Sequence, residues 1–220
     1  MTSLAKPPPN RQAAELHNPS IYPAQNVDFQ STYCEAYAEI RARHELQPLR
    51  QGHLDGLCSL YATINAIRLV RAEAGGLTHQ QNKRLFASGM AFLAKQGNLQ
   101  KMITKGLCRR RRKALARHLA EAASCSINKV VIERPDCEKI ENVGDVFDWI
   151  TRSLLKNKPV LIPLMGTLSH LTVVSRISER RLTLFDSGGL YYVRKSSCGL
   201  KGGVHQIQVK GLMRIMVQSS

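Results

Sequence analysis

Acidic residues, aromatic residues and long apolar runs are all scarce in this chain of 220 residues. Only 16 Asp and Glu stand against 32 Lys and Arg, which gives a net charge of +16 and an isoelectric point near 10.0. Aromatic side chains make up 5% of the residues and no RNA- or DNA-binding motif is present, so the sequence offers no sign of a base-stacking surface. The longest apolar run, from Pro159 to Met165, has the length of a strand, and we expect no membrane span.

The six cysteines lack the spacing of a metal or redox site. They form no Cys-x-x-Cys pair and have no histidine at zinc-finger distance, so we expect neither a metal nor another cofactor. A chain of this length needs no disulfides to fold, and its N-terminus lacks the apolar segment of a signal peptide. We therefore expect a cytoplasmic protein, or one delivered by a specialised secretion system.

The pattern of apolar residues predicts one α+β domain over residues 28–220, with helices first and an antiparallel sheet after them. Residues 1–27 are rich in proline and have no apolar periodicity, which predicts a flexible N-terminal arm. Helical spacing occurs at 28–50 in part, 58–70, 80–95, 109–123 and 145–155. Alternating or β-branched runs predict strands at 130–132, 160–164, 170–177, 181–185, 191–193 and 205–216.

A cysteine stands at the start of the first strongly apolar helix. Residues 51–57 form a turn with two glycines, the helix begins at Cys58, and Asp55 or Gly56 is expected to cap it. The partial positive charge of a helix N-terminus favours the thiolate, which is the reactive form of cysteine. Such a thiolate also needs a neighbouring base, and the base needs a third group to fix its tautomer.

A histidine and an aspartate face each other across the predicted hairpin. His170 begins the second strand and Asp186 follows the third, and the turn between these strands is centred near residue 179. Paired residues in such a hairpin have a nearly constant sum of numbers, so His170 and Asp186 lie almost opposite within the slack of one bulge. The sequence therefore predicts a Cys58, His170 and Asp186 triad.

These segments resemble the papain-like cysteine peptidases. The run from Gln51 to Ala66 is similar to their nucleophile region, and Ser-His170-Leu-Thr-Val-Val followed by Leu-Phe-Asp186 is similar to their histidine and acid strands. The similarity is greatest to the compact bacterial domains related to double-glycine leader peptidases. The resemblance implies a papain-like fold, with Cys58 as nucleophile, His170 as general base, Asp186 as its orienting group, and Gln51 with the Cys58 N–H as oxyanion hole.

Other interpretations of the same residues exist. Cys58 and His170 could be buried structural side chains, Asp186 could only stabilise a turn, and His53 is a second candidate base. The triad also fits transglutaminase-type acyl transfer as well as hydrolysis of a peptide or isopeptide bond in a protein substrate. A bacterial effector or toxin is one role compatible with a thiol protease of this kind.

A basic segment at residues 101–118 contains no acidic residue. It holds the run Arg109-Arg-Arg-Arg-Lys113 on a predicted helix, where successive side chains point about 100° apart and so surround the helix start. The segment predicts an anionic partner, either an acidic protein or nucleic acid, although charge runs are commonly only solvated surface. A basic binding module that keeps the papain-like scaffold without turnover is therefore the alternative to an enzyme.

Overall fold

The computed structural model describes residues 46–52, 55–125 and 128–219, and they form an α+β structure. The N-terminal arm at 1–27, the helical spacing before residue 46 and His53 lie outside these residues. The helices are α3 (Cys58–Arg71), α4 (His79–Lys95), α5 (Leu99–Lys105), α6 (Arg109–Ala123) and α7 (Val143–Leu154), with 3-10 turns at η1 (Ala72–Ala74), η2 (Cys137–Lys139), η3 (Lys195–Ser197) and η4 (Val209–Gly211). The predicted α+β class is confirmed, and the helix expected over 109–123 has the bounds of α6.

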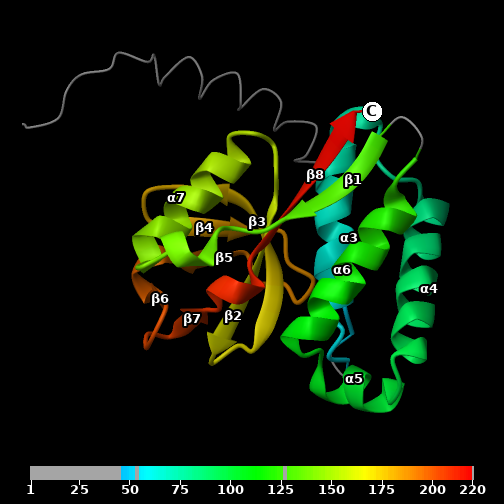
Figure 1. Ribbon diagram of the computed structural model, residues 1–220, viewed down its shortest axis with the longest axis horizontal. Helices are drawn as coiled ribbons and strands as arrows, with labels where there is room; N and C mark the ends of the chain where they lie inside the picture. The colour runs from blue at the N-terminus through cyan, green and yellow to red at the C-terminus, as the bar shows by residue number, and fades with distance from the viewer. Residues whose placement is uncertain (1–45, 53–54, 126–127, 220) are drawn as a thin grey trace, which may run out of the picture.

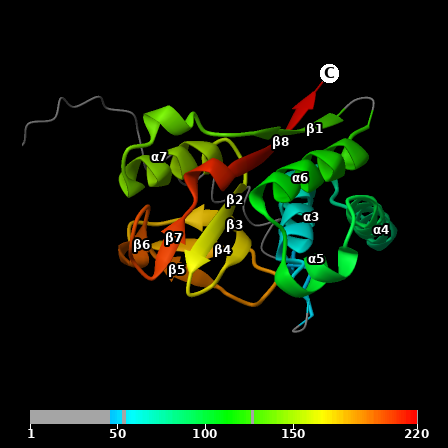
Figure 2. The same cartoon turned by 60° about the horizontal axis from the view of Figure 1, so that its bottom comes forward.

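Eight strands form one sheet, which is antiparallel except for one short pair. The strands are β1 (Asn128–Glu133), β2 (Val160–Gly166), β3 (His170–Ile177), β4 (Arg181–Leu184), β5 (Tyr192–Arg194), β6 (Cys198–Gly199), β7 (His205–Ile207) and β8 (Met213–Ser219). The main order is β1-β8-β2-β3-β4-β5, with β7 beside β2 and β6 parallel to β7. The last strand thus pairs with the first, and the two extend together away from the rest of the sheet (Figures 1 and 2).

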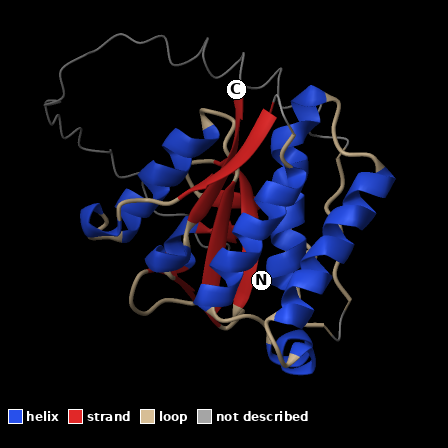
Figure 3. Ribbon diagram, turned by 45° about the vertical axis from the view of Figure 1, so that its right-hand side comes forward, coloured by secondary structure: helices blue, strands red, loops and turns tan. Residues whose placement is uncertain are grey.

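Two separate cores cover the two faces of the sheet. On β2, Leu161 belongs to the core built with α3, α4 and α6, whereas its neighbours Val160 and Ile162 belong to the core under α7. Strands buried on both faces read as continuous apolar runs, which is what residues 160–164 show. Figure 3 shows the strands of the sheet lying between helical segments on either side.

Helix α3 is the most deeply buried helix of the structure, and it packs against β3 and α6. Leu60, Ile64 and Ile67 are fully buried on its apolar face. Each such side chain stabilises the fold by about 1.5–3 kcal/mol. The start of α3, and Cys58 with it, is therefore held rigidly against the sheet.

One element of this framework was missed by the sequence analysis, and one prediction was wrong. The helix at 99–105 was not predicted, since seven residues give too little periodicity to recognise. The long strand expected at 205–216 is instead β7, the 3-10 turn η4 and β8. The interruption lies beside Pro163 of β2, which has no N–H to donate to a neighbouring strand and whose ring lies where a side chain at Gly211 would have to be.

Candidate functional site

Cys58 is the first residue of α3, and the helix start carries no side-chain cap. The predicted cap at Asp55 or Gly56 was wrong, because Leu57 occupies the N-cap position. The carboxylate of Asp55 instead accepts hydrogen bonds from the N–H groups of Gly52, at 2.8 Å, and Leu57, at 3.0 Å, and so shapes the turn before the helix. The first N–H groups of a helix have no partner within it, so the uncapped start leaves donors around the thiol.

The structure brings His170 and Asp186 into direct contact. The distance from His170 Nε2 to Asp186 Oδ1 is 2.5 Å, and the side chains are 15% and 1% exposed. A register shift between Val174 and Arg176 of β3 supplies the bulge that the hairpin prediction allowed. The second carboxylate oxygen of Asp186 accepts hydrogen bonds from the N–H groups of Gly188, at 2.8 Å, and Leu190, at 3.0 Å. Asp186 thus stabilises its turn and also contacts the histidine.

Burial and mutual charge set the protonation of these three side chains. Burial alone raises the pKa of Cys58, but hydrogen bonds from His170 and the Leu171 backbone, with the charge of His170, lower it below its ordinary 9.0. Burial opposes the charge of His170, yet Asp186 and Cys58 raise its pKa to about 9. Burial likewise opposes the charge of Asp186, and His170 lowers its pKa to about 2. These shifts all act in the direction of a Cys58 thiolate beside a His170 imidazolium.

Which nitrogen of His170 faces the thiol follows from the contact with Asp186. Since Nε2 is directed at the carboxylate, Nδ1 is the nitrogen left to interact with Cys58. An ionised carboxylate only accepts hydrogen bonds, so Nε2 carries a proton. The aspartate therefore fixes the tautomer and the ring orientation that a base for Cys58 requires.

Gln51 lies beside the same residues and is held from several directions. Its backbone N–H donates to the carbonyl of Ser187 at 3.1 Å, and its side-chain Oε1 accepts from the Ser187 hydroxyl at 3.1 Å. The buried Asn65 of α3 binds both the N–H and the carbonyl of Leu49, at 2.8 and 3.1 Å, two residues before Gln51. With Oε1 bound to Ser187, the amide Nε2 of Gln51 is left as a donor.

The candidate site residues line a cavity of about 360 Å³. Its wall includes Gln51, Cys58 and His170, so the candidate nucleophile, base and oxyanion donor face one space. Ser169, also in the wall, has a φ of 44°, which is uncommon for a residue with a side chain. Strain of this kind persists only where the surroundings impose it, and here it directly precedes His170.

The basic segment also reaches the cavity, which the sequence did not indicate. The Gly56 N–H donates to the carbonyl of Ile103, and a Cβ on Gly56 would lie 2.7 Å from the Gly106 nitrogen, so the turn before Cys58 packs tightly on the loop between α5 and α6. Arg112 of α6 then lines the cavity with Cys58. Helical phase alone could not show which arginine of the run lines the cavity.

The described residues contain no metal centre and no membrane-spanning helix. Within residues 46–52, 55–125 and 128–219, no group of three His, Cys, Asp or Glu is arranged to hold a metal ion. The five cysteines in this part of the chain form no disulfide with one another. No helix there combines the length and the apolar character needed to cross a membrane.

Comparisons with known proteins give no relative from which a function could be transferred. No family model matches the chain, and no curated protein or solved structure matches it significantly. The site must therefore be interpreted from its own geometry.

Proposed function

We propose that this chain is a papain-like cysteine peptidase that hydrolyses peptide or isopeptide bonds. The observation that carries the proposal is the position of His170, which contacts Asp186 and lines one cavity together with the helix-terminal Cys58. The imidazole thus lies between a nucleophile and an orienting carboxylate, as nucleophilic catalysis by a thiol requires.

The reaction follows from the placement of the groups. The Cys58 thiolate attacks the carbonyl carbon, and the C–S bond forms as the carbonyl electrons move to oxygen. The N–H of Cys58 and the Nε2 amide of Gln51 bind this oxyanion. The Nδ1 proton of His170 passes to the departing amine as the C–N bond breaks, which leaves a thioester on Cys58. Water then attacks the thioester, His170 Nδ1 takes its proton, and the acid and the Cys58 thiolate are released.

A digest of a peptide library tests the proposal. Incubation with the wild-type chain should create new N-termini, read by mass spectrometry, that are missing after incubation with the Cys58→Ala variant. A Cys58→Ala preparation that yields the same products, or a wild-type chain that yields none and does not react with a p-nitrophenyl ester, overturns it. That second result would favour a non-catalytic basic binding module.

Adding a primary amine to the same digest separates hydrolysis from acyl transfer. A thioester on Cys58 reacts with water or with an amine, and the triad alone permits both outcomes. A peptidase should release free carboxyl ends even when the amine is abundant. Products that carry the amine throughout would instead assign transglutaminase-type transfer.

A further inference from the structure

A group of basic side chains lies beside the cavity at Cys58, and one of them, Arg112, also lines that cavity. Arg112 lines the cavity and also a shallow depression next to it, whose wall includes Arg109, Lys113, Arg134 and Lys210. Three of these cations come from α6, one follows β1 and one belongs to η4. Residues distant in sequence therefore gather one sign of charge at one end of the cavity. We call these five residues the basic trough.

The charge of the basic trough is not neutralised by the described part of the chain. There, the Lys and Arg ion pairs with acidic residues are Lys139 with Asp136 and Arg214 with Glu133, and neither includes a trough residue. The neighbouring cations of Arg117 and Arg134 lower the pKa of Lys113, as expected where like charges crowd together. A concave surface lined by one sign of charge concentrates counter-ions, so the trough attracts anions to the edge of the site.

Arg112 is the member of the trough placed to contact a substrate close to the bond attacked. It is partly buried, and its guanidinium donates to the Gln208 side chain at 3.1 Å, which holds it in place. Burial lowers the pKa of Arg112, and the charges of Cys58 and Cys108 partly oppose that lowering. A guanidinium keeps further donors for a carboxylate after giving one to an amide oxygen.

We propose that the substrate is a polypeptide with acidic side chains beside the bond attacked, and that Arg112 and the basic trough bind their carboxylates. The inference rests on the proposed function, because an acyl reaction needs a carbonyl that a peptide supplies and a nucleic-acid backbone does not. Neither the cavity nor the depression is lined by Phe, Tyr or Trp, so neither offers the stacking surface that single-stranded nucleic acid uses.

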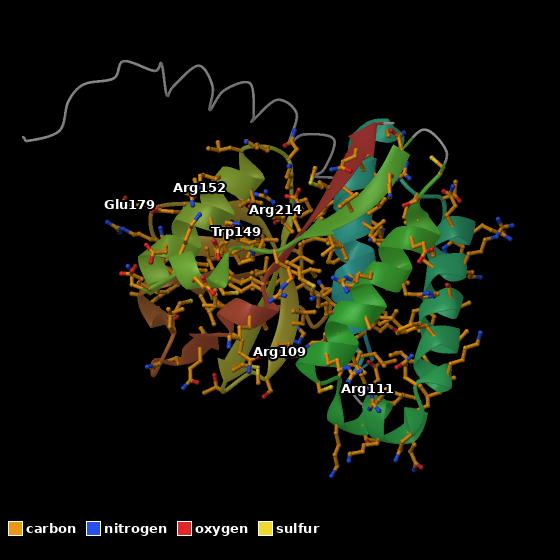
Figure 4. All side chains as sticks on the ribbon, in the orientation of Figure 1. Arg109, Arg111, Trp149, Arg152, Glu179 and Arg214 are labelled. Atoms are coloured by element: carbon orange, nitrogen blue, oxygen red, sulfur yellow. The ribbon has the colours of Figure 1, made fainter. Side chains whose placement is uncertain are left out.

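The neighbouring Arg111 provides a matched control for Arg112. Its guanidinium donates to the carbonyl of Gln96 at 3.3 Å, beyond the end of α4, and it lines neither the cavity nor the depression. Figure 4 shows Arg109 and Arg111 on different sides of the start of α6. Arg112→Gln and Arg111→Gln therefore remove the same charge from adjacent residues, and only the first removes it from the cavity.

The test uses the full chain and the products of the library digest. Wild-type cleavage sites should be enriched in Asp and Glu on one side, and Arg112→Gln should reduce kcat/KM on an acidic peptide by about tenfold or more. Arg111→Gln should keep the enrichment in Asp and Glu and the kcat/KM of the wild type. Arg112→Lys should keep part of the preference for acidic peptides. No enrichment, or equal losses in Arg112→Gln and Arg111→Gln, overturns the proposal.

A binding measurement keeps this proposal separable from the proposed function. Cys58→Ala protein should bind labelled polyglutamate more tightly than a neutral peptide, and an added Arg112→Gln change should weaken that binding while an added Arg111→Gln change should not. Binding without any cleavage in the digest would rule out the peptidase and keep the basic trough as a surface that binds acidic peptides. Cleavage without preference for acidic peptides would keep the peptidase and rule out the basic trough as a substrate-binding surface. If duplex DNA displaces the labelled polyglutamate at a lower concentration of negative charges than unlabelled polyglutamate does, the basic trough is assigned to nucleic acid and the proposal is overturned.

Discussion

Replacing Asp186 by Asn removes one charge and leaves the shape of the side chain almost unchanged. In the native chain one carboxylate oxygen contacts His170 and the other accepts two backbone N–H groups. An asparagine side chain has a single acceptor oxygen, so it cannot accept hydrogen bonds both from His170 and from the two backbone N–H groups. If its oxygen keeps the backbone donors, its NH₂ group faces Nε2 of His170, which must then lose its proton. The imidazolium is thereby destabilised.

The pKa of His170 sets the size of the effect. Burial alone would lower this pKa, but Asp186 and Cys58 together raise it from 6.5 to about 9. This net rise corresponds to about 3 kcal/mol, or roughly 300-fold in an equilibrium constant, and it sets the scale of the effect although burial, which lowers the pKa, offsets part of what Asp186 contributes. The thiolate that depends on the imidazolium should become scarcer in proportion. We therefore expect iodoacetamide to alkylate Cys58 about ten to three hundred times more slowly at neutral pH.

The assay is site-resolved alkylation. Trypsin cleaves after Arg50 and Arg68, and the peptide between them contains Cys58 as its single cysteine, so mass spectrometry follows this thiol alone. Asp148→Asn, which changes an exposed aspartate on α7, is the matched control and should react like the wild type. Circular dichroism establishes that both variants are folded. An unchanged rate in folded Asp186→Asn would refute the role given to this carboxylate.

Three further results are expected. Gln51→Ala should slow acylation of Cys58 by a p-nitrophenyl ester about 10²–10³-fold, yet change alkylation by iodoacetamide less than about twofold, because alkylation forms no oxyanion; equal slowing of both reactions would contradict the oxyanion role. Gly56→Ala should reduce the free energy of unfolding by about 1–3 kcal/mol in urea titrations, because the added Cβ lies 2.7 Å from the Gly106 nitrogen; an unchanged midpoint would show that this turn is not tightly packed. Since the pKa of Asp186 is lowered from 3.8 to about 2, its contribution to stability is present above pH 3.8 and disappears as the pH falls toward 2. Asp186→Asn should therefore flatten the dependence of the free energy of unfolding on pH in this range. A dependence equal to that of the wild type would contradict the contribution assigned to Asp186.

The parts of the site that the sequence predicted are those set by local geometry. Cys58 was placed at a helix start by the apolar spacing that follows it, and His170 was placed opposite Asp186 by a hairpin whose strands lie close together in sequence. Periodicity and register are properties of short segments, so one sequence is enough to read them. The helical half of the fold and most of the antiparallel sheet could be predicted for the same reason.

The remaining features depend on contacts between distant segments. Arg112 reaches the cavity because the loop after α5 packs on Gly56, and Gln51 is held by Ser187, which lies 136 residues later in the chain. No periodicity encodes such contacts. Asn65 carried the clearest missed signal, because an amide among the apolar residues of a buried helix must find a partner, and it binds the backbone that leads to Gln51.

The coupling of Cys58 to His170, which lowers the pKa of the Cys58 thiol, is the basis of the proposed chemistry. It is tested most directly by the ultraviolet absorbance of the thiolate, recorded over a pH titration as the difference between the wild type and Cys58→Ser. We expect one thiolate with a midpoint below 9.0, and we expect His170→Ala to move this midpoint upward because the partner charge is then lost. A midpoint at or above 9.0, or one unaffected by His170→Ala, would contradict it.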